Sequence, residues 1–284
     1  MTTVAYQGEP GAFGEEAVVG WFGTDATPVP VATFSAVCTA VETGAADAGV
    51  LPLENSLAGT VGDALDALAG GSLRVVGEVM LPIRHQLLGV PGAMLDAIQR
   101  VSSHWQALAQ CERFLSGHAW QVIPAADTAG AARELVATGD RTAAAIASRS
   151  AAERYGLEIL AADVHDSEHN MTRFAVLVGA QAAMPNAAGS LAPRGGGRET
   201  LLTFETGHRP GDLYRALGTL ADAGINLSRI ESRPSGEGPW RYRFLIQVAG
   251  DADAEPLHSA LIGLQAHTRS LRVLGSFDTA GEEN

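Results

Sequence analysis

The sequence has few cysteines, few basic residues and no long unbroken apolar run. Cys38 and Cys111 are the only cysteines among 284 residues, which excludes a disulfide framework. No apolar stretch is long enough for a transmembrane helix, and the first residues lack the basic and apolar layout of a signal peptide. These absences predict a cytoplasmic protein that makes no use of a membrane.

The charge balance is acidic. Lys and Arg number 19 against 32 Asp and Glu, which gives a formal net charge of −13. Nucleic acid is therefore not an expected partner, because phosphate binding needs a basic surface. The same charge repels an anionic substrate at long range. Any anion site must be local, built from a few arginines and backbone amides.

Short apolar runs alternate with helical patterns, and 46% of the residues are hydrophobic. This alternation predicts an α/β fold in which helices connect the strands. Beyond residue 80, the same alternation predicts a strand over 83–90 and a helix over 104–115. Residues 181–198 are rich in Ala, Gly and Pro and lack an apolar period, as in a linker. The order βαββαβ over 199–277 is the ferredoxin-like arrangement.

Thr172, Arg173 and Phe174 place a hydroxyl, a guanidinium and an aromatic ring at consecutive positions, directly before an apolar run. In an extended segment Thr172 and Phe174 share one face and Arg173 lies on the other, unless a turn re-aims it. Arg173 is able to hold a carboxylate through a two-pronged contact, and Thr172 to make one hydroxyl contact. The trio suits a small anionic ring substrate; a polar loop that enters a buried strand is the alternative.

This triplet and several further segments, in the same order, resemble prephenate dehydratase followed by an ACT regulatory domain. The segments are Tyr6–Ala17, Leu51–Val61, His85–Leu88, Ser103–Cys111 and Asp127–Ala129 for the enzyme, and Gly224–Leu227 and Glu231–Pro234 for the ACT domain. The resemblance implies a catalytic domain over 1–180 with two lobes, like a periplasmic binding protein. Lobe 1 would comprise about 1–80 and 170–180, lobe 2 about 81–169, and the substrate would lie in the cleft between them.

The resemblance also implies a reaction, the conversion of prephenate to phenylpyruvate, water and carbon dioxide in phenylalanine biosynthesis. No cofactor and no metal are implied, because the ring becomes aromatic and positioning with local electrostatics is sufficient. The catalytic residues would be Thr172 beside the leaving hydroxyl, Arg173 on a substrate carboxylate and Phe174 under the ring. The alternatives are a structural ion pair for Arg173 and ordinary strand core for Phe174.

Four further residues are assigned to substrate binding. Asn55 and Ser56 follow a strand end, where the backbone amides of a turn are able to bind an anion without basic residues. Ser103 and Gln106 lie at a candidate helix start in lobe 2 and would close the cleft from the other side. The polar segment His165–His169 is assigned to a hinge loop rather than to a metal site.

For the ACT domain the resemblance implies feedback regulation by phenylalanine, bound between paired domains. The expected contacts are Gly211, Leu213, Asn226, Glu231 and Ser232. Pairing predicts a homodimer or homotetramer. Asp212 stands where the family usually has alanine, so it either caps the following helix or changes the choice of effector.

Three alternatives to this function differ in substrate or in class. Ala12 and Gly14 resemble the arogenate-using relatives, so arogenate dehydratase is a close alternative. A decarboxylase that stops before aromatisation is disfavoured, because such relatives lack the threonine found here as Thr172. A non-catalytic amino-acid-binding regulatory protein, with a cleft and a sensor domain but no chemistry, is the alternative of a different class.

Overall fold

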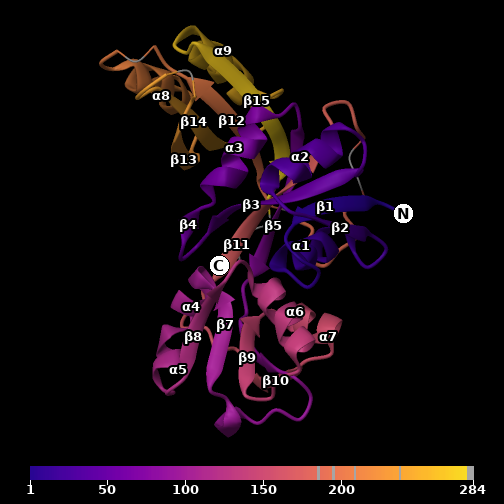
Figure 1. Cartoon of the computed structure of the whole chain (residues 1–284). Helices are drawn as coiled ribbons and strands as arrows, with labels where there is room; N and C mark the ends of the chain where they lie inside the picture. Colours follow the sequence, from indigo (N-terminus) through magenta and orange to yellow (C-terminus); the bar gives the residue numbers. More distant parts are fainter. Residues whose placement is uncertain (184–185, 194–195, 208, 237, 280–284) are drawn as a thin grey trace.

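The strands of the protein form three separate sheets, arranged one above another in Figure 1. The computed structural model describes residues 1–183, 186–193, 196–207, 209–236 and 238–279. The C-terminal domain lies at the top of Figure 1, lobe 1 in the middle and lobe 2 at the bottom. The expected fold class, two α/β lobes and a ferredoxin-like domain, is confirmed. Within the described ranges, no helix is long and apolar enough to cross a membrane.

Lobe 1 is built on a sheet whose central strands are buried on both faces. Its strand order is β2 (Thr27–Val31), β1 (Thr3–Gln7), β3 (Ala48–Asn55), β11 (Met171–Val178) and β5 (Arg74–Pro82), with β4 (Gly59–Thr60) paired to β3. Its helices are α1 (Phe13–Phe22), α2 (Phe34–Glu42) and α3 (Gly62–Gly70). The strand β11 is antiparallel to both neighbours and brings the distant triplet beside Asn55.

Lobe 2 differs in detail from the expectation. Its strand order is β10 (Glu158–Ala161), β6 (Gln86–Gly89), β9 (Ala143–Ala147), β7 (Arg100–His104) and β8 (Gln121–Ala125). Its helices are α4 (Trp105–Ala109), α5 (Glu112–Ser116), α6 (Thr128–Thr138) and α7 (Arg149–Tyr155), with a 3₁₀ turn η1 (Leu95–Ala97). The prediction of one helix over 104–115 was wrong, and the strand β7 before it was not predicted. The helix breaks at Gln110, whose carbonyl accepts the amide of Asp166 at 2.7 Å instead of continuing the helical pattern.

The chain crosses between the lobes twice, after β5 and before β11. The two crossings lie side by side, because Ile83 N donates to Asn170 O at 2.8 Å. The ends of β3, β5 and β11 therefore meet at the junction of the lobes. Polar residues at these strand ends are brought to one place.

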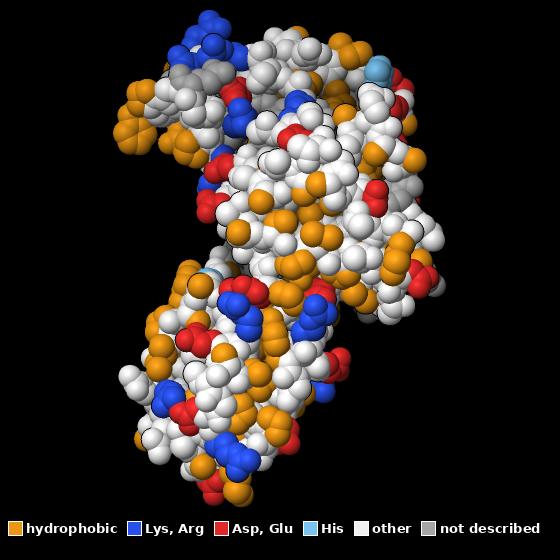
Figure 2. Space-filling model, turned by 45° about the vertical axis from the view of Figure 1, so that its right-hand side comes forward, with side chains coloured by type: hydrophobic (Ala, Val, Ile, Leu, Met, Phe, Trp, Pro, Cys, Tyr) orange, Lys and Arg blue, Asp and Glu red, His pale blue; other side chains and the backbone are white. Residues whose placement is uncertain are grey.

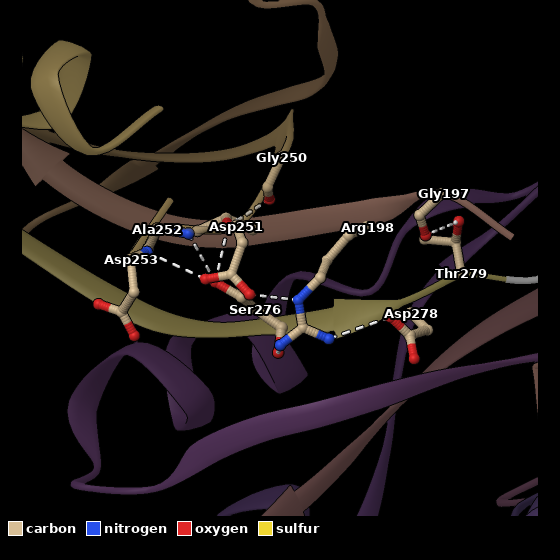
Figure 3. Close-up of polar contacts among 10 residues, drawn as sticks. Gly197, Arg198, Gly250, Asp251, Ala252, Asp253, Ser276, Asp278 and Thr279 are labelled. Atoms are coloured by element: carbon tan, nitrogen blue, oxygen red, sulfur yellow. Dashed lines mark hydrogen bonds and ion pairs between the residues drawn. The ribbon is translucent and has the colours of Figure 1, made fainter. Parts of the chain in front are cut away.

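The C-terminal domain has the strand order β13 (Leu227–Pro234), β14 (Tyr242–Ala249), β12 (Arg198–Glu205) and β15 (Ser270–Asp278), with helices α8 (Asp212–Asp222) and α9 (Leu257–Ala266). The helices cover one face of this sheet (Figure 1). The other face packs on lobe 1, where Leu245 and Phe277 share a core with Leu51 and Leu53. Arg198, at the start of β12, pairs with Asp251 and Asp278 and fastens the first strand to the last (Figure 3).

The expected linker 181–198 is partly attached to lobe 1. Its described part includes Leu191, whose amide donates to Gly20 O at 2.8 Å and whose side chain packs against the lobe 1 core. Gly189 N donates to Trp21 O at 2.7 Å. Residues 184, 185, 194 and 195 of this segment lie outside the described residues.

Candidate functional site

A cleft of about 530 Å³ lies between the two lobes and is lined by both. Lobe 1 contributes Phe13, Asn55 and Thr172, and lobe 2 contributes Gln106 and Asp127. The molecule narrows where the lower lobe meets the rest, as Figure 2 shows. A cleft between lobes, lined by apolar side chains and a few polar groups, is where ligands bind in folds of this kind.

Thr172 and Asn55 form the polar centre of the cleft. They are partners in the register of β11 and β3, and Asn55 Nδ2 donates to Thr172 Oγ1 at 3.0 Å. The orientation of the Asn55 amide is fixed, because its Oδ1 accepts the backbone amides of Leu57 at 3.1 Å and Ala58 at 2.9 Å. Thr172 Oγ1 thus acts as an acceptor toward Asn55. Its own hydrogen finds no acceptor among the residues that the structure describes and is available to a ligand.

Three further polar side chains connect to Asn55, and none of them was assigned a role from the sequence. Asn170 Oδ1 accepts from Asn55 Nδ2 at 2.7 Å, and Asn170 Nδ2 donates to Gln110 Oε1 at 2.9 Å. Gln110 Nε2 lies 3.3 Å from Asn55 Oδ1, and Gln110 Oε1 lies 2.9 Å from His85 Nε2. His85 and Gln110 also line the cleft. Burial lowers the pKa of His85 to about 4, so its ring is neutral at neutral pH.

The other two members of the triplet face opposite ways, as strand alternation predicts. Phe174 is 4% exposed; it lines the cleft and packs in the lobe 1 core, so both of its expected roles are compatible with its position. Arg173 does not line the cleft. Its Nε lies 3.9 Å from Oε2 of the buried Glu78, on the face of the sheet that the C-terminal domain covers. This geometry supports the alternative that Arg173 forms a structural ion pair.

Of the four residues assigned to substrate binding, the structure places Asn55 and Gln106 in the cleft. Ser56 is instead part of the hinge, because it donates to His169 O at 2.7 Å and accepts from Met171 N at 3.0 Å. Ser103 is fully buried in β7 and donates to Ile146 O on the neighbouring strand. The assignment of Ser103 presupposed a helix start, and the residue lies in a strand.

The backbone amides of the Asn55–Ser56 turn were expected to bind an anion, and the structure does not leave them free to do so. The amides of Leu57 and Ala58 are engaged by Asn55 Oδ1 and are not free for a ligand. No arginine is among the described residues that line the cleft. The N-terminal ends of α1, α3, α4 and α6 open onto it instead, and α1 and α3 lack a side-chain cap. The positive ends of helix dipoles attract anions without a basic side chain.

The segment His165–His169 is engaged in contacts with arginines. His165 Nε2 lies 2.9 Å from Arg84 Nη1, and Asp166 lies 3.5 Å from Arg113 Nε. Throughout the described ranges, no group of three or more His, Cys, Asp or Glu side chains is placed to hold a metal ion.

The expected effector residues do not meet within one chain. Gly211, with a φ of 82°, and Leu213 lie at the start of α8, whereas Asn226 lies beyond its other end. The 11 residues of α8 separate the two ends by about 16 Å. Glu231 is hydrogen-bonded to Thr60 of lobe 1, while Ser232 is exposed on the opposite face of β13.

Asp212 is the first residue of α8 and does not serve as its N-cap, which is Gly211. Its carboxylate accepts Arg209 N at 2.9 Å and pairs with Arg215 at 2.6 Å. The carboxylate therefore closes the turn that leads into the helix.

Comparison with known proteins identifies both parts of the chain. The sequence model of the family described as prephenate dehydratase matches residues 4–182, and that of the ACT domain matches residues 200–262. A bifunctional N-acyl-homoserine lactone acylase/prephenate dehydratase of Komagataeibacter europaeus is 37% identical over 278 residues, which cover 96% of this chain and 95% of the relative. An arogenate dehydratase/prephenate dehydratase of Arabidopsis thaliana is 39% identical over 289 residues, which cover 96% of this chain and 71% of the relative. The crystal structure of prephenate dehydratase in complex with L-Phe from Arthrobacter aurescens has a TM-score of 0.87 and 34% identity, and covers 97% of this chain and 90% of that one.

Proposed function

The chain belongs to the prephenate dehydratase family of lyases and has a C-terminal ACT domain, and from this premise we propose that it converts prephenate to phenylpyruvate, water and carbon dioxide. The observation that supports the proposal is the hydroxyl of Thr172. It lies in the cleft between the lobes, accepts from Asn55 at 3.0 Å and retains its hydrogen for a ligand. A hydrogen-bond donor directed at a leaving oxygen is what this reaction requires.

In the proposed reaction the ring carboxylate leaves as carbon dioxide. The electron pair of the broken carbon–carbon bond moves into the ring, and the carbon–oxygen bond to the ring hydroxyl breaks. The departing hydroxide takes up one proton from the solvent and becomes water, so the reaction consumes one proton. Thr172 contributes a hydrogen bond to the oxygen as negative charge develops there, and it releases no proton, because an aliphatic hydroxyl is too weak an acid at neutral pH. Phe174, which lines the cleft, packs against the ring.

The two carboxylates of the substrate are proposed to bind at helix N-termini. The uncapped ends of α1 and α3 offer backbone amides at the cleft, and Gln106 at the start of α4 adds a side-chain amide from lobe 2. The net charge of −13 repels an anionic substrate at long range, but the attraction of the helix N-termini is local and does not depend on the overall field.

Arogenate is the second candidate substrate. Ala12 and Gly14, the two positions that resemble arogenate-using relatives, both line the cleft. Ala12 has only a methyl group and Gly14 has no side chain, so neither position offers a hydroxyl to the substrate.

The test is a turnover assay at neutral pH with prephenate and with arogenate as parallel substrates. We expect phenylpyruvate to form from prephenate with no added metal or nucleotide. Its formation is monitored by ultraviolet absorbance. A kcat/KM at least about tenfold higher for arogenate would make arogenate dehydratase the function. No turnover of either substrate by folded protein would contradict the proposal and favour a non-catalytic binding protein.

We also propose that phenylalanine binds between the ACT domains of two chains and lowers turnover. The relative from Arthrobacter aurescens was solved in complex with L-Phe, and the separation of Gly211 from Asn226 within one chain favours a site completed by a second copy. Titration of phenylalanine by calorimetry, with turnover measured on the same samples, tests both parts. Absence of binding would contradict the effector assignment without affecting the reaction.

A further inference from the structure

We propose that His85 and Gln110 are positioning residues that act through Asn55 to direct the hydroxyl of Thr172 into the cleft. The inference rests on the proposed function and concerns how its principal donor is oriented. His85 is on the crossing from lobe 1 to lobe 2, Gln110 is the C-cap of α4, and Asn55 ends β3, so three distant segments contribute. The side chains connect in sequence from His85 to Thr172 through contacts of 2.7–3.3 Å.

The orientation of every amide in this network follows from two backbone groups. The amides of Leu57 and Ala58 are donors only, so the atom of Asn55 that faces them must be the carbonyl oxygen. Asn55 Nδ2 then faces three acceptors, Asn170 Oδ1, Thr172 Oγ1 and the carbonyl oxygen of Met171 at 3.1 Å. Asn170 Nδ2 in turn faces Gln110, and the atom it meets must be the acceptor Oε1.

The same reasoning fixes the tautomer of His85. Gln110 Oε1 is an acceptor, so the ring nitrogen 2.9 Å away, Nε2, must bear the hydrogen. The Nδ1 atom of the neutral ring is then an unprotonated acceptor. It is buried and has no hydrogen-bond partner among the described residues. His85 is 2% exposed and its ring meets Phe13 edge-on at a centroid distance of 5.5 Å, so it has no room to turn over freely.

The network matters because a reversed Asn55 would disable Thr172. With Oδ1 in place of Nδ2, the amide would accept the hydroxyl hydrogen of Thr172 and withdraw it from the cleft. The amides of Leu57 and Ala58 set the orientation of Asn55. Gln110 reinforces it from both sides, since its Nε2 faces Asn55 Oδ1 and its Oε1 holds Asn170, which accepts from Asn55. His85 completes the arrangement by donating to Gln110 Oε1.

The kinetic test uses Gln110→Met, which removes both polar ends of the side chain at similar volume, and Gln121→Met on the exposed part of β8 as its matched control. We expect Gln110→Met to lower kcat by about tenfold or more, with KM changed by less than about threefold. The control should remain within about twofold of wild type, as expected of an exposed surface change. His85→Leu should resemble Gln110→Met, and His85→Gln, which restores an N–H donor, should recover most of kcat. Failure of His85→Gln to exceed His85→Leu would overturn the role of His85.

A double variant separates positioning from a merely structural role. If Gln110 acts through Thr172, Gln110→Met added to Thr172→Ala should lower kcat by less than about twofold further, because the group that it orients is already absent. If the decrease in kcat of the double variant equals the product of the decreases in the two single variants, the proposal is overturned.

Nitrogen NMR of the His85 ring gives a readout that does not depend on turnover. The Nε2–H tautomer is expected at neutral pH, and the Nδ1–H tautomer would overturn the proposal. If neither prephenate nor arogenate is consumed by wild-type protein, the proposed function fails, whereas the tautomer still tests the network.

Discussion

A hydroxyl that accepts one hydrogen bond and has its own hydrogen free is a directed donor, and Thr172 is the residue for which this is decisive. Replacement by alanine removes the donor and leaves the cleft otherwise intact. We expect Thr172→Ala to lower kcat by about 10²- to 10³-fold, the cost of one donor to a developing oxyanion, with little change in KM. Steady-state kinetics on prephenate measures both constants.

The matched variant for this prediction is Thr172→Ser, which keeps the hydroxyl and removes only a methyl group. It should retain kcat within about tenfold of wild type, because the donor is kept. A modest loss is expected, since the serine rotamer is less restricted than that of threonine. Wild-type kcat in Thr172→Ala would remove Thr172 from the mechanism.

His85 links the cleft to the pH dependence of stability. Burial lowers its pKa in the folded protein to about 4, below the ordinary value of 6.5. As the pH falls below 6.5, the unfolded chain takes up a proton that the folded protein does not, so the free energy of unfolding decreases until the pH reaches about 4. At about pH 5 the loss from this group amounts to about 2 kcal/mol.

His85→Gln cannot titrate and should lose less stability than wild type between about pH 7 and about pH 5. Urea unfolding at the two pH values measures the difference. His267→Gln, at an exposed position, is the control and should follow wild type. If the free energy of unfolding decreases equally in His85→Gln and in wild type, the His85 ring does not contribute to the pH dependence of stability.

Individual residues show where the sequence was sufficient and where it was not. Strand alternation correctly put Thr172 and Phe174 on one face and Arg173 on the other. It could not show that the Arg173 face is covered by the ACT domain and contains Glu78, because that contact joins segments far apart in the chain. Asn170 and Gln110 could have been noted as amides flanking assigned residues, but only folding brings them together.

At the scale of elements, β13 of the ACT domain contacts lobe 1 through every second residue. Arg229 Nη2 donates to Leu53 O at 3.0 Å, Glu231 is hydrogen-bonded to Thr60, and Arg233 pairs with Asp66 at 2.6 Å. Alternate residues of a strand share one face, so a single strand contacts β3, β4 and α3. These elements flank Asn55, so a displacement of β13 would move residues that line the cleft.

We therefore expect Thr60→Val, which is isosteric but cannot bond Glu231, to weaken the link between the two domains. Phenylalanine should still bind, as measured by calorimetry, while its effect on turnover should decrease by about threefold or more. Thr24→Val, at an exposed site in lobe 1, is the control. Unchanged regulation in Thr60→Val would show that the effect of phenylalanine does not pass through this contact.

Two parts of lobe 2 were not predicted correctly, the strand β7 and the helical segment that follows it. The strand β7 has only one apolar residue, Val101, and is stabilised by parallel pairing with β8 and β9. The helical pattern over 104–115 is real, but Asp166 from the hinge loop takes the carbonyl of Gln110 and divides it. Tertiary hydrogen bonds determine both the strand β7 and the break in the helix, and local sequence propensity does not predict such contacts.

For the whole molecule, the order of domains and the fold class were predictable because each depends on local patterns repeated along the chain. The docking of the ACT sheet on lobe 1 was not, since its buried residues, such as Leu245 and Phe277, read as ordinary strand core. The attachment of Leu191 to α1 was missed because a lone leucine in a Gly- and Ala-rich segment has no period.

The surface of the ACT domain is suited to association with a second copy of the chain. Large hydrophobic side chains are exposed there, among them Ile230 (43%), Tyr214 (81%) and Trp240 (77%), and hydrophobic groups project at the upper left of Figure 2, where the ACT domain lies. Ile230 lies on the edge strand β13, on the side turned away from lobe 1. Exposed apolar groups at an unpaired sheet edge favour pairing with a second copy.

We expect wild-type protein to be a homodimer or homotetramer by light scattering, and Ile230→Asp to shift it toward a smaller species, because a buried unpaired carboxylate opposes association. Val122→Asp, which places the same charge at an exposed apolar position of lobe 2, should leave the size unchanged. If two chains complete the effector site between Gly211 of one and Asn226 of the other, Ile230→Asp should lose phenylalanine binding and keep turnover of prephenate. A variant that dissociates yet binds phenylalanine as wild type would place the effector site within one chain, against the separation of about 16 Å along α8.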